Sequence, residues 1–393
     1  MTSIGIFTYS TKPRGSVVHA TYLAEALTAR GHDVTLYALS KAGDRLYREL
    51  DCPVVYLRAG AAPSEPVALI AQRIHEVGVG VSDAAPRHEV LHAEDCLVAS
   101  GLLSVRPALG QARLVRTLHH FEHFDSPYLR ACQRRSILEA DAVACVSHVS
   151  QRDVQRELGL TCPIIGNGVD VARFEPDVAL AEWARRRFQL SDGEAVVLSV
   201  GGVEPRKNSL TALDAMTGVL SRQPGLRWLI AGGASIWEHD AYREVFRQRV
   251  AELEPALRSR ICELGPVSER ELSGLYQCSQ ILLCPSLQEG FGLCVLEALA
   301  ARMAVVVSSA APFTEYLTPE TACFVEPESA LSIAQAVERL WCDSQHRAAL
   351  ARAGAALARA FSWESVAIEH ERLYAALLGS RPPFDVHEES IHA

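Results

Sequence analysis

Short apolar runs typical of buried strands alternate with helix-forming stretches along the chain, and this alternation limits the folds it can adopt. A predicted strand over Ile4–Tyr9 is followed by a predicted helix over Val17–Arg30, which Gly31 ends, and by a strand over Val34–Leu39. Parallel strands joined in this way need right-handed crossover connections. A further helix is predicted over Pro66–Val77, ending before Gly78 and Gly80, and the alternation restarts at Ala195–Gly201. The sequence therefore predicts an α/β protein with doubly wound parallel sheets.

The length of the chain, 393 residues, suits two domains of ordinary size. We expect a first Rossmann-like domain over residues 1–168 and a second over residues 169–362. A predicted helix over residues 363–378 follows the second domain, and residues 379–393 should form a mobile tail. The two domains should face each other across a cleft.

Composition excludes several classes of protein. The chain carries 38 basic and 47 acidic residues, a net charge of −9, which argues against non-specific binding to nucleic acid. Its 11 cysteines contain no Cys-x-x-Cys pair and no secretory leader precedes the first strand, so we expect reduced thiols in a cytoplasmic protein. No apolar run is long enough to span a bilayer. Peripheral membrane contact and the oligomeric state stay open.

The stretch Cys284–Ala298 is the strongest functional signal. It joins a predicted strand, Gln280–Cys284, to a predicted helix, Leu293–Ala301, and so lies at the edge of the sheet where ligands bind in open α/β folds. Glycines at 290 and 292 let the backbone approach a ligand, and the N–H groups that follow them carry the positive end of the helix dipole. With Glu289 and Glu297, this pattern suits a sugar that carries a phosphate.

A second charged loop, Val200–Asn208, also follows a predicted strand and precedes a helix. Its adjacent cations Arg206 and Lys207 are placed to neutralise a leaving diphosphate, although a solvated charged loop would look the same in sequence. In the first half, the strand Leu114–Leu118 ends at His119. A metal site formed by His119, Glu122 and His123 is the competing interpretation of that loop.

The run Glu-Gly-Phe-Gly-x4-Glu over residues 289–297 closely resembles the signature of the retaining GT-B glycosyltransferases that include glycogen synthase-like and phosphatidylinositol mannosyltransferase-like enzymes. Glu-Pro-Arg-Lys-Asn over residues 204–208 and Asn-Gly-Val-Asp over residues 167–170 are also similar to motifs of that family. The resemblance covers nearly all of residues 1–378 and implies a GT-B fold of two Rossmann-like domains. It also implies that the second domain binds most of the nucleotide-sugar donor, that the first binds most of the acceptor, and that the helix over residues 363–378 crosses back onto the first domain.

The same resemblance implies roles for individual residues. His119, Glu289, Lys207 and Arg206 are the expected catalytic residues, with Glu289 orienting the donor sugar and His119 assisting at the reacting centre. Glu297 is expected to hold the ribose hydroxyls. The other expected donor-binding residues are Gly15, Ser16, Gly265, Val267, Gly290, Phe291, Gly292 and Leu293. Ser16 stands where relatives have a second glycine.

No Asp-x-Asp sequence, the usual carboxylate pair that holds a metal against a nucleotide-sugar diphosphate, occurs in the chain. We therefore expect no metal site and no cofactor, with Arg206 and Lys207 and the helix dipole replacing the metal charge. The predicted function is transfer of a hexose-type sugar from a nucleoside diphosphate sugar to a small-molecule, lipid or glycan acceptor. A sugar-nucleotide epimerase or hydrolase of the same architecture, and a non-catalytic sugar-nucleotide binder, are the alternatives.

Overall fold

A computed structural model describes residues 1–84, 87–233 and 239–379 of the chain. The chain divides into two compact units, which are considered separately. Unit 1 contains Met1–Gly166 and the segment that starts at Trp363, and unit 2 contains Asn167–Ser362. Apart from Gly379, the predicted tail lies outside the described residues.

Unit 1 is built on a parallel sheet of six strands in the order β3-β2-β1-β4-β5-β6. The strands are β1 (Ser3–Thr8), β2 (Asp33–Lys41), β3 (Val54–Ala59), β4 (Val90–Ala93), β5 (Arg113–Leu118) and β6 (Ala142–Cys145). Strand order reverses between β1 and β4, which are paired with Phe7 opposite Ala93. That reversal is the point at which ligands bind in doubly wound sheets.

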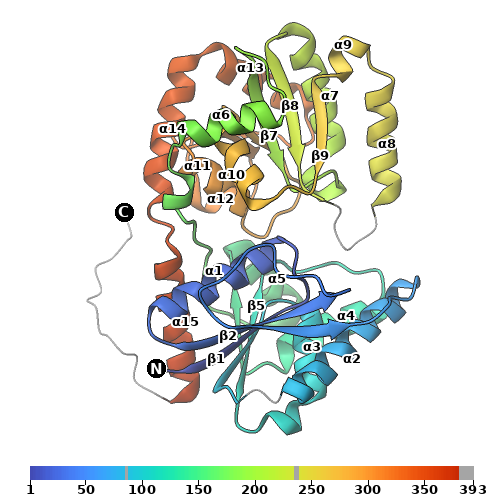
Figure 1. Ribbon diagram of the computed structural model, residues 1–393, viewed down its shortest axis with the longest axis vertical. Coiled ribbons are helices and arrows are strands. Elements are labelled where there is room, and N and C mark those ends of the chain that lie inside the picture. The colour runs from blue at the N-terminus through green and yellow to red at the C-terminus, as the bar shows by residue number, and fades with distance from the viewer. Residues whose placement is uncertain (85–86, 234–238, 380–393) are drawn as a thin grey trace. The chain divides into compact units, whose positions relative to one another are not determined.

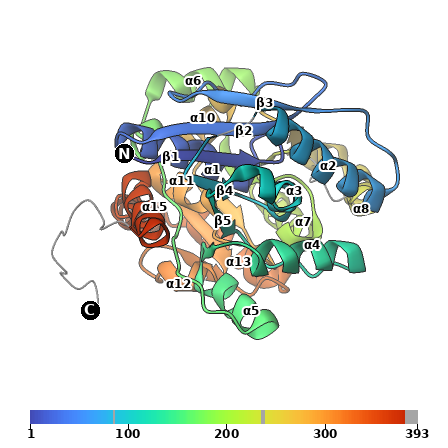
Figure 2. The ribbon, with the colours of Figure 1, turned by 90° about the horizontal axis from the view of Figure 1, so that it is seen from below.

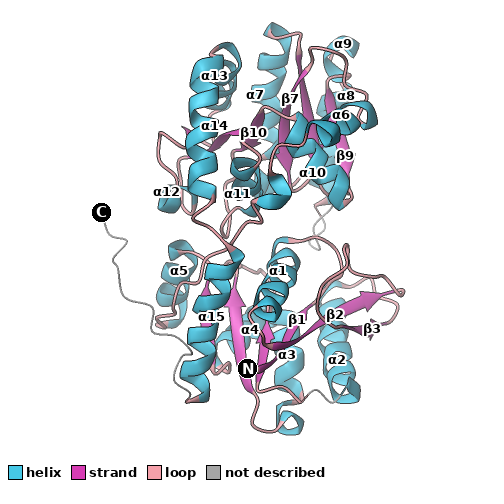
Figure 3. Ribbon diagram, turned by 60° about the vertical axis from the view of Figure 1, so that its left-hand side comes forward, coloured by secondary structure: helices cyan, strands magenta, loops and turns pink. Residues whose placement is uncertain are grey.

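The helices of unit 1 come between these strands in the chain or, for α5 and α15, after the last of them, and Figure 3 shows strands in magenta and helices in cyan. They are α1 (Gly15–Ala29), α2 (Pro66–Ala84), α3 (Cys96–Ser104), the short 3-10 helix η1 (Arg106–Leu109), α4 (Pro127–Leu138), α5 (His148–Leu158) and α15 (Trp363–Leu378). Helix α1 begins two residues earlier than the sequence predicted, so Gly15 and Ser16 form its first turn.

Helix α2 corrects a sequence prediction. Gly78 and Gly80 were expected to follow a helix ending at Val77, but both lie inside α2. Figure 2 shows α2 beside α3, and a Cβ on Gly78 would lie only 2.7 Å from the Ser104 hydroxyl oxygen. The glycines therefore allow close packing of two helices, and this packing outweighs their low helix propensity.

The C-terminal helix α15 belongs to unit 1 and packs against α1, as Figure 1 shows. The Trp363 ring stacks on Tyr22 of α1 with 5.3 Å between ring centroids. Arg30, next to the end of α1, donates two hydrogen bonds of 2.6 and 2.8 Å to Glu371. The segment after residue 362 thus returns to the unit that contains the N-terminus.

Unit 2 repeats the architecture with a parallel sheet in the order β12-β11-β10-β7-β8-β9. Its strands are β7 (Ala195–Val200), β8 (Leu226–Ala231), β9 (Ile261–Gly265), β10 (Ile281–Cys284), β11 (Ala304–Ser308) and β12 (Cys323–Val325). Its helices are η2 (Ala172–Phe174), α6 (Val178–Arg187), η3 (Pro205–Lys207), α7 (Ser209–Arg222), α8 (Asp240–Ala251), α9 (Pro255–Arg258), α10 (Glu269–Cys278), α11 (Leu293–Ala300), α12 (Phe313–Tyr316), α13 (Ala330–Cys342) and α14 (Ser344–Ala358).

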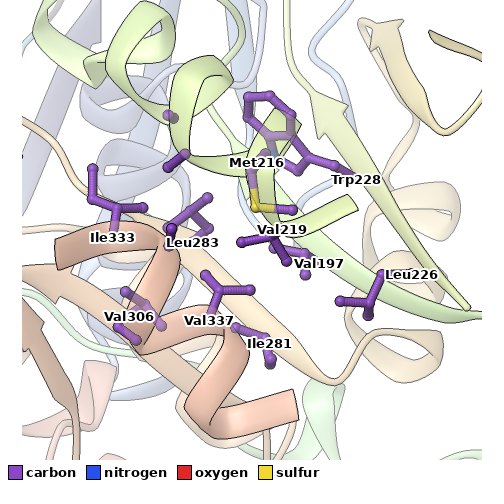
Figure 4. Close-up of a cluster of buried hydrophobic side chains, with 14 of the residues drawn as sticks. Val197, Met216, Val219, Leu226, Trp228, Ile281, Leu283, Val306, Ile333 and Val337 are labelled. Atoms are coloured by element: carbon purple, nitrogen blue, oxygen red, sulfur yellow. The ribbon is translucent and has the colours of Figure 1, made fainter. Parts of the chain in front are cut away.

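The core of unit 2 lies between one face of this sheet and helices α7 and α13. Figure 4 shows strand residues such as Val197 and Leu283 packed against Met216 of α7 and Val337 of α13. The intervening strand residues, such as Leu198, are equally buried on the opposite face. Strands buried on both faces are apolar throughout rather than alternating, which explains the continuous runs in the sequence.

The architecture confirms the predicted α/β fold with two doubly wound parallel sheets. None of the helices in the described ranges is both long and apolar enough to cross a membrane.

Candidate functional site

The two charged loops of unit 2 meet where its strand order reverses. Strand β7 pairs with β10, with Val197 opposite Ile281, although more than eighty residues separate them. The loop after β7 carries Arg206 and Lys207, and the loop after β10 carries Glu289. Sheet topology therefore brings the motifs of residues 200–208 and 284–298 together at the carboxyl ends of neighbouring strands.

Lys207, Arg206 and Glu289 form an ion-paired group. The Lys207 ammonium donates to Glu289 Oε1 at 2.5 Å, and Arg206 Nη1 lies 3.4 Å from Glu289 Oε2. Arg206 also pairs with Glu204 at 2.7 Å. The Lys207 and Glu289 side chains are only 12% and 9% exposed, whereas Arg206 is 41% exposed. Three of the predicted catalytic residues are thus in direct contact.

Hydrogen bonds that the sequence did not predict fix these loops to each other. The Leu287 N–H donates to the Arg206 carbonyl at 2.8 Å. The Asn208 amide donates to the carbonyls of Pro285 and Pro327 at 3.1 and 2.5 Å. Asn208 has a left-handed backbone with φ of 59°, which asparagine tolerates better than most residues. Ser286 donates a further hydrogen bond to Glu289 at 3.0 Å.

Lys207 and Glu289 each stabilise the charged form of the other. Burial alone would raise the pKa of Glu289, but the Lys207 and Arg206 charges lower it to about 2. Burial opposes the charge on Lys207, and Glu289 reverses this effect and raises the pKa of the ammonium. Together with Glu204, which pairs with Arg206, the two loops hold two cations and two carboxylates in contact. An anionic ligand would compete with these carboxylates for the two cations.

Glycines at the ends of β7, β8 and β9 allow the backbone to pack closely beside Lys207 and against neighbouring strand ends. Gly201 and Gly202 have φ of 121° and 79°, and a Cβ on Gly201 would lie 2.5 Å from Lys207 Cε. A Cβ on Gly232 would lie 2.5 Å from the Gly202 nitrogen, so these backbones touch. Gly232 donates to the carbonyl of Gly265, the last residue of β9, at 2.9 Å. Val267 follows in the turn after β9.

Gly292 is required by the structure at the start of α11. Its φ is 97°, and a Cβ would lie 2.6 Å from Phe313. Phe291 is 8% exposed and stacks on Tyr316, whose hydroxyl donates to the Phe291 carbonyl at 3.1 Å, so its side chain packs inside the unit. Gly290 lies in the loop before it, and Leu293 begins the helix.

Glu297 lies in α11, about one turn after its start. Its Oε2 accepts a hydrogen bond of 2.7 Å from the Tyr276 hydroxyl of α10. Burial raises the pKa of Glu297 to about 7, although this hydrogen bond and the charge of Arg173 oppose the rise. No contact between Glu297 and the Lys207 group is recorded among the described residues. A carboxyl group held at such a pKa is typical of functional sites.

In unit 1, Gly15 and Ser16 begin α1, which follows β1. A Cβ on Gly15 would have no neighbour within 4 Å, so packing within the unit does not require a glycine there. The first turn of α1 contains no acidic residue. The Val18 N–H of this turn donates to the Arg14 carbonyl at 2.8 Å, and donor binding by Gly15 and Ser16 stays a prediction.

His119 follows β5 and contacts a residue that the sequence did not predict. Its Nε2 lies 2.8 Å from Glu94 Oε2, directly after β4, and His19 Nδ1 of α1 lies 3.0 Å from the same oxygen. Glu94 and His19 are fully buried, and the His119 side chain is 16% exposed. A Glu-Asp pair directly after a strand was the sequence signal that could have identified Glu94.

The alternative metal site of His119, Glu122 and His123 does not match the side-chain contacts of the structure. Glu122 pairs with His120 rather than with His119, and the exposed His123 ring lies against Phe121. His19, Glu94 and His119 instead place their ligand atoms within 4.8 Å of one another, which is close enough to share a metal ion.

Comparisons with known proteins agree with this geometry. The family model described as "Glycosyl transferases group 1" matches residues 182–356, which carry the Lys207 group and Glu297. The model described as "Glycosyltransferase Family 4" matches residues 13–173, which carry Gly15 and His119.

Individual relatives cover different parts of the chain. The chain is 27% identical over 257 residues to a D-inositol 3-phosphate glycosyltransferase of Corynebacterium glutamicum, covering 64% of this chain and 60% of that protein. The match thus spans about three fifths of the length of the D-inositol 3-phosphate glycosyltransferases to which the chain is similar. It is 28% identical to a glycogen synthase of Mycobacterium tuberculosis over 93% of this chain and 92% of that protein.

Among solved structures, Anabaena Alr3699/HepE in complex with UDP and glucose matches with a TM-score of 0.80. The match covers 96% of this chain and all of that one at 19% identity, and so concerns the fold.

Proposed function

Because the chain belongs to the group 1 and family 4 glycosyl transferases, we propose that it transfers a hexose-type sugar from a nucleoside diphosphate sugar to an acceptor, with retention of anomeric configuration. The observation that carries this proposal is the contact between Lys207, Arg206 and Glu289 where the strand order of unit 2 reverses. This contact combines two cations with a carboxylate next to a glycine-lined backbone.

The leaving diphosphate gains negative charge as the glycosidic bond breaks. Cations next to it bind this charge more strongly in the transition state than in the ground state, which lowers the barrier. Lys207 is suited to this task because its ammonium is already held in place by Glu289. In the proposed complex the diphosphate takes up part of the Lys207 and Arg206 charge, and Glu289 becomes free to accept hydrogen bonds from sugar hydroxyls.

Glu297 has a separate role in this proposal. It lies on a buried helix, and one of its carboxyl oxygens accepts a hydrogen bond from Tyr276. The other oxygen can then accept hydrogen bonds from ribose hydroxyls. His119 of unit 1 is proposed to assist at the reacting centre. Metal-independent transfer is a further proposal, supported by the absence of an Asp-x-Asp pair in the sequence and by the two cations of the loop.

The donor is proposed to be a nucleoside diphosphate hexose. UDP-glucose is the first probe, because the HepE structure contains UDP and glucose. A cytoplasmic location also stays a proposal, supported by the eleven cysteines, which are all free thiols.

A thermal-shift screen in EDTA tests the proposal. A ligand at a hundred times its Kd adds about 2.7 kcal/mol of stability. UDP-glucose, ADP-glucose and GDP-mannose should each be tested, and at least one should raise the melting temperature of unit 2 by roughly 5 to 10 °C.

The shift should be lost in Lys207→Ala. It should persist in Arg222→Ala, which removes the ion pair between the exposed Arg222 of α7 and Glu338 of α13. A protein that no nucleotide sugar stabilises, in EDTA or with Mg²⁺, would contradict the proposed function.

A further inference from the structure

Glu94 is a fully buried carboxylate that joins two histidines from different elements of unit 1. Its Oε2 lies 2.8 Å from His119 Nε2 and 3.0 Å from His19 Nδ1. Its own N–H donates to the Phe7 carbonyl at 3.1 Å, which fixes the backbone of Glu94 to β1. The carboxylate therefore lies between β1 and β4, where the strand order of unit 1 reverses.

The two imidazole contacts define which ring nitrogens carry protons. Burial opposes the charge of Glu94, but the His19 and His92 imidazoles and the two hydrogen bonds hold its pKa well below the ordinary value. An ionised carboxylate accepts hydrogen bonds and donates none. Both nitrogens that face it must therefore be N–H donors, Nε2 on His119 and Nδ1 on His19.

His119 itself is neutral at physiological pH. Burial lowers its pKa to about 4, although the hydrogen bond to Glu94 opposes this change. Other groups near the cluster are His92, His370 and Arg116, and burial lowers the pKa of each of them. Asp95 also lies nearby, and burial raises its pKa to about 6. A neutral imidazole with a proton on Nε2 has its lone pair on Nδ1.

We infer that Glu94 is a positioning residue that holds His119 as the neutral Nε2–H tautomer, with the Nδ1 lone pair available to a substrate. Nε2 is bonded to the fully buried Glu94, so Nδ1 is the ring nitrogen left for a substrate, and 16% of the His119 side chain is exposed. The Nδ1 lone pair can accept a proton from an acceptor hydroxyl, which an N–H cannot do. This inference rests on the proposed function for its catalytic meaning, but not for its geometry.

A metal ion on the same three residues is the competing explanation. Ligation through His19 Nδ1 would move the proton of that ring to Nε2, which is buried and has no partner among the described residues. Histidines that bind metals almost always donate the other N–H to an acceptor. The contacts to Glu94 also have the length of hydrogen bonds to a charged acceptor. The geometry thus favours positioning over metal binding.

The tautomer of His119 can be observed directly. Long-range ¹H–¹⁵N spectra of protein labelled with ¹⁵N-histidine distinguish the two tautomers, and the signals missing in His119→Gln assign this residue among 14 histidines. The wild-type protein at pH 7 should show His119 as the pure Nε2–H tautomer. An Nδ1–H tautomer, an imidazolium or a mixture would overturn the inference.

Glu94→Gln tests the cause. Both imidazoles contact the same carboxylate oxygen. An amide places there either its oxygen, a weaker acceptor than a carboxylate, or its N–H groups, which favour a lone pair on Nε2, so His119 should become a tautomer mixture. Glu371→Gln is the matched control, because it removes another carboxylate–histidine contact in unit 1, to His32 at 2.9 Å. The control should leave the His119 signals unchanged. A pure Nε2–H tautomer retained in Glu94→Gln would contradict the positioning role.

Two further measurements distinguish a positioning role of Glu94 from a purely structural role and from metal binding. With UDP-glucose as the donor probe, Glu94→Gln should lower kcat about a hundredfold and change KM less than threefold. Equal loss in the Glu371→Gln control would overturn the inference. Metal analysis of the purified wild-type protein should find no stoichiometric transition metal, and one that His19→Gln removes would also overturn it. If UDP-glucose is not turned over at all, the proposed function fails for this donor while the tautomer spectra still decide the role of Glu94.

Discussion

Glu297→Gln should make the protein more stable, by an amount that grows from almost nothing at pH 4.5 to its full value above about pH 7. The wild-type carboxyl group has a pKa of about 7 in the folded protein, against an ordinary value of 4.5, because burial disfavours its charge. Below pH 4.5 it is protonated in both the folded and the unfolded state, so it does not affect stability there. Between pH 4.5 and about 7 the unfolded chain loses the proton first, and stability falls as pH rises.

The loss of wild-type stability levels off above pH 7, where the Glu297 carboxyl group is ionised in both the folded and the unfolded state. At 1.36 kcal/mol for each pH unit, the rise from 4.5 to about 7 costs about 3 kcal/mol. A glutamine cannot ionise and can still accept the Tyr276 hydrogen bond through its carbonyl oxygen. The variant should therefore gain about 3 kcal/mol at pH 8.5 and almost nothing at pH 4.5, or roughly 6 to 12 °C in the melting temperature of unit 2.

Thermal melts of wild type and variant at both pH values measure this difference. Glu271→Gln is a control of opposite sign, because hydrogen bonds from the Ser268 backbone and side chain outweigh burial and lower the pKa of Glu271. It should lose stability at pH 8.5. An equal gain of Glu297→Gln at both pH values, or no gain at pH 8.5, would show that Glu297 is not held at a raised pKa.

Other predictions concern activity. Lys207→Ala should lower kcat by on the order of a hundredfold, while Arg222→Ala should stay within threefold of wild type, and a kcat within threefold for the first variant would refute a transition-state role. Glu297→Ala should weaken binding of the free nucleoside diphosphate more than it slows transfer of bound donor, because ribose hydroxyls do not change charge in the reaction; calorimetry showing equal affinity would rule this out. Turnover should persist in excess EDTA, and activity that vanishes there and returns with Mg²⁺ or Mn²⁺ would show that the mechanism needs a metal.

The unit 2 site could be predicted because its signals are local. Gly292 and the charged loop 204–208 are short patterns at strand ends, and parallel topology brings such ends together in any doubly wound sheet. The sequence could not show which side chains of the two loops form ion pairs and hydrogen bonds with each other. The contact of Lys207 with Glu289, and the support from Asn208 and Ser286, depend on side-chain directions in two loops more than seventy residues apart.

The unit 1 site was predicted only in part for a different reason. His119 was identified, but its partner Glu94 also binds His19, which is 75 residues away inside a buried helix. Neither residue belongs to a local pattern that requires the other. The end of α2 was misplaced because Gly78 usually marks a helix end, whereas here it accommodates the neighbouring helix. Long-range packing decided both cases.

The most direct test of the account follows donor cleavage by ¹H NMR in EDTA. The nucleotide sugar that gives the largest thermal shift is incubated with wild-type protein, and the anomeric signals of the released or transferred sugar are recorded before they equilibrate. The account predicts that the first sugar product keeps the anomeric configuration of the donor, with Lys207→Ala about a hundredfold slower. A first product of inverted configuration, or cleavage that is equally fast without Lys207, would contradict it.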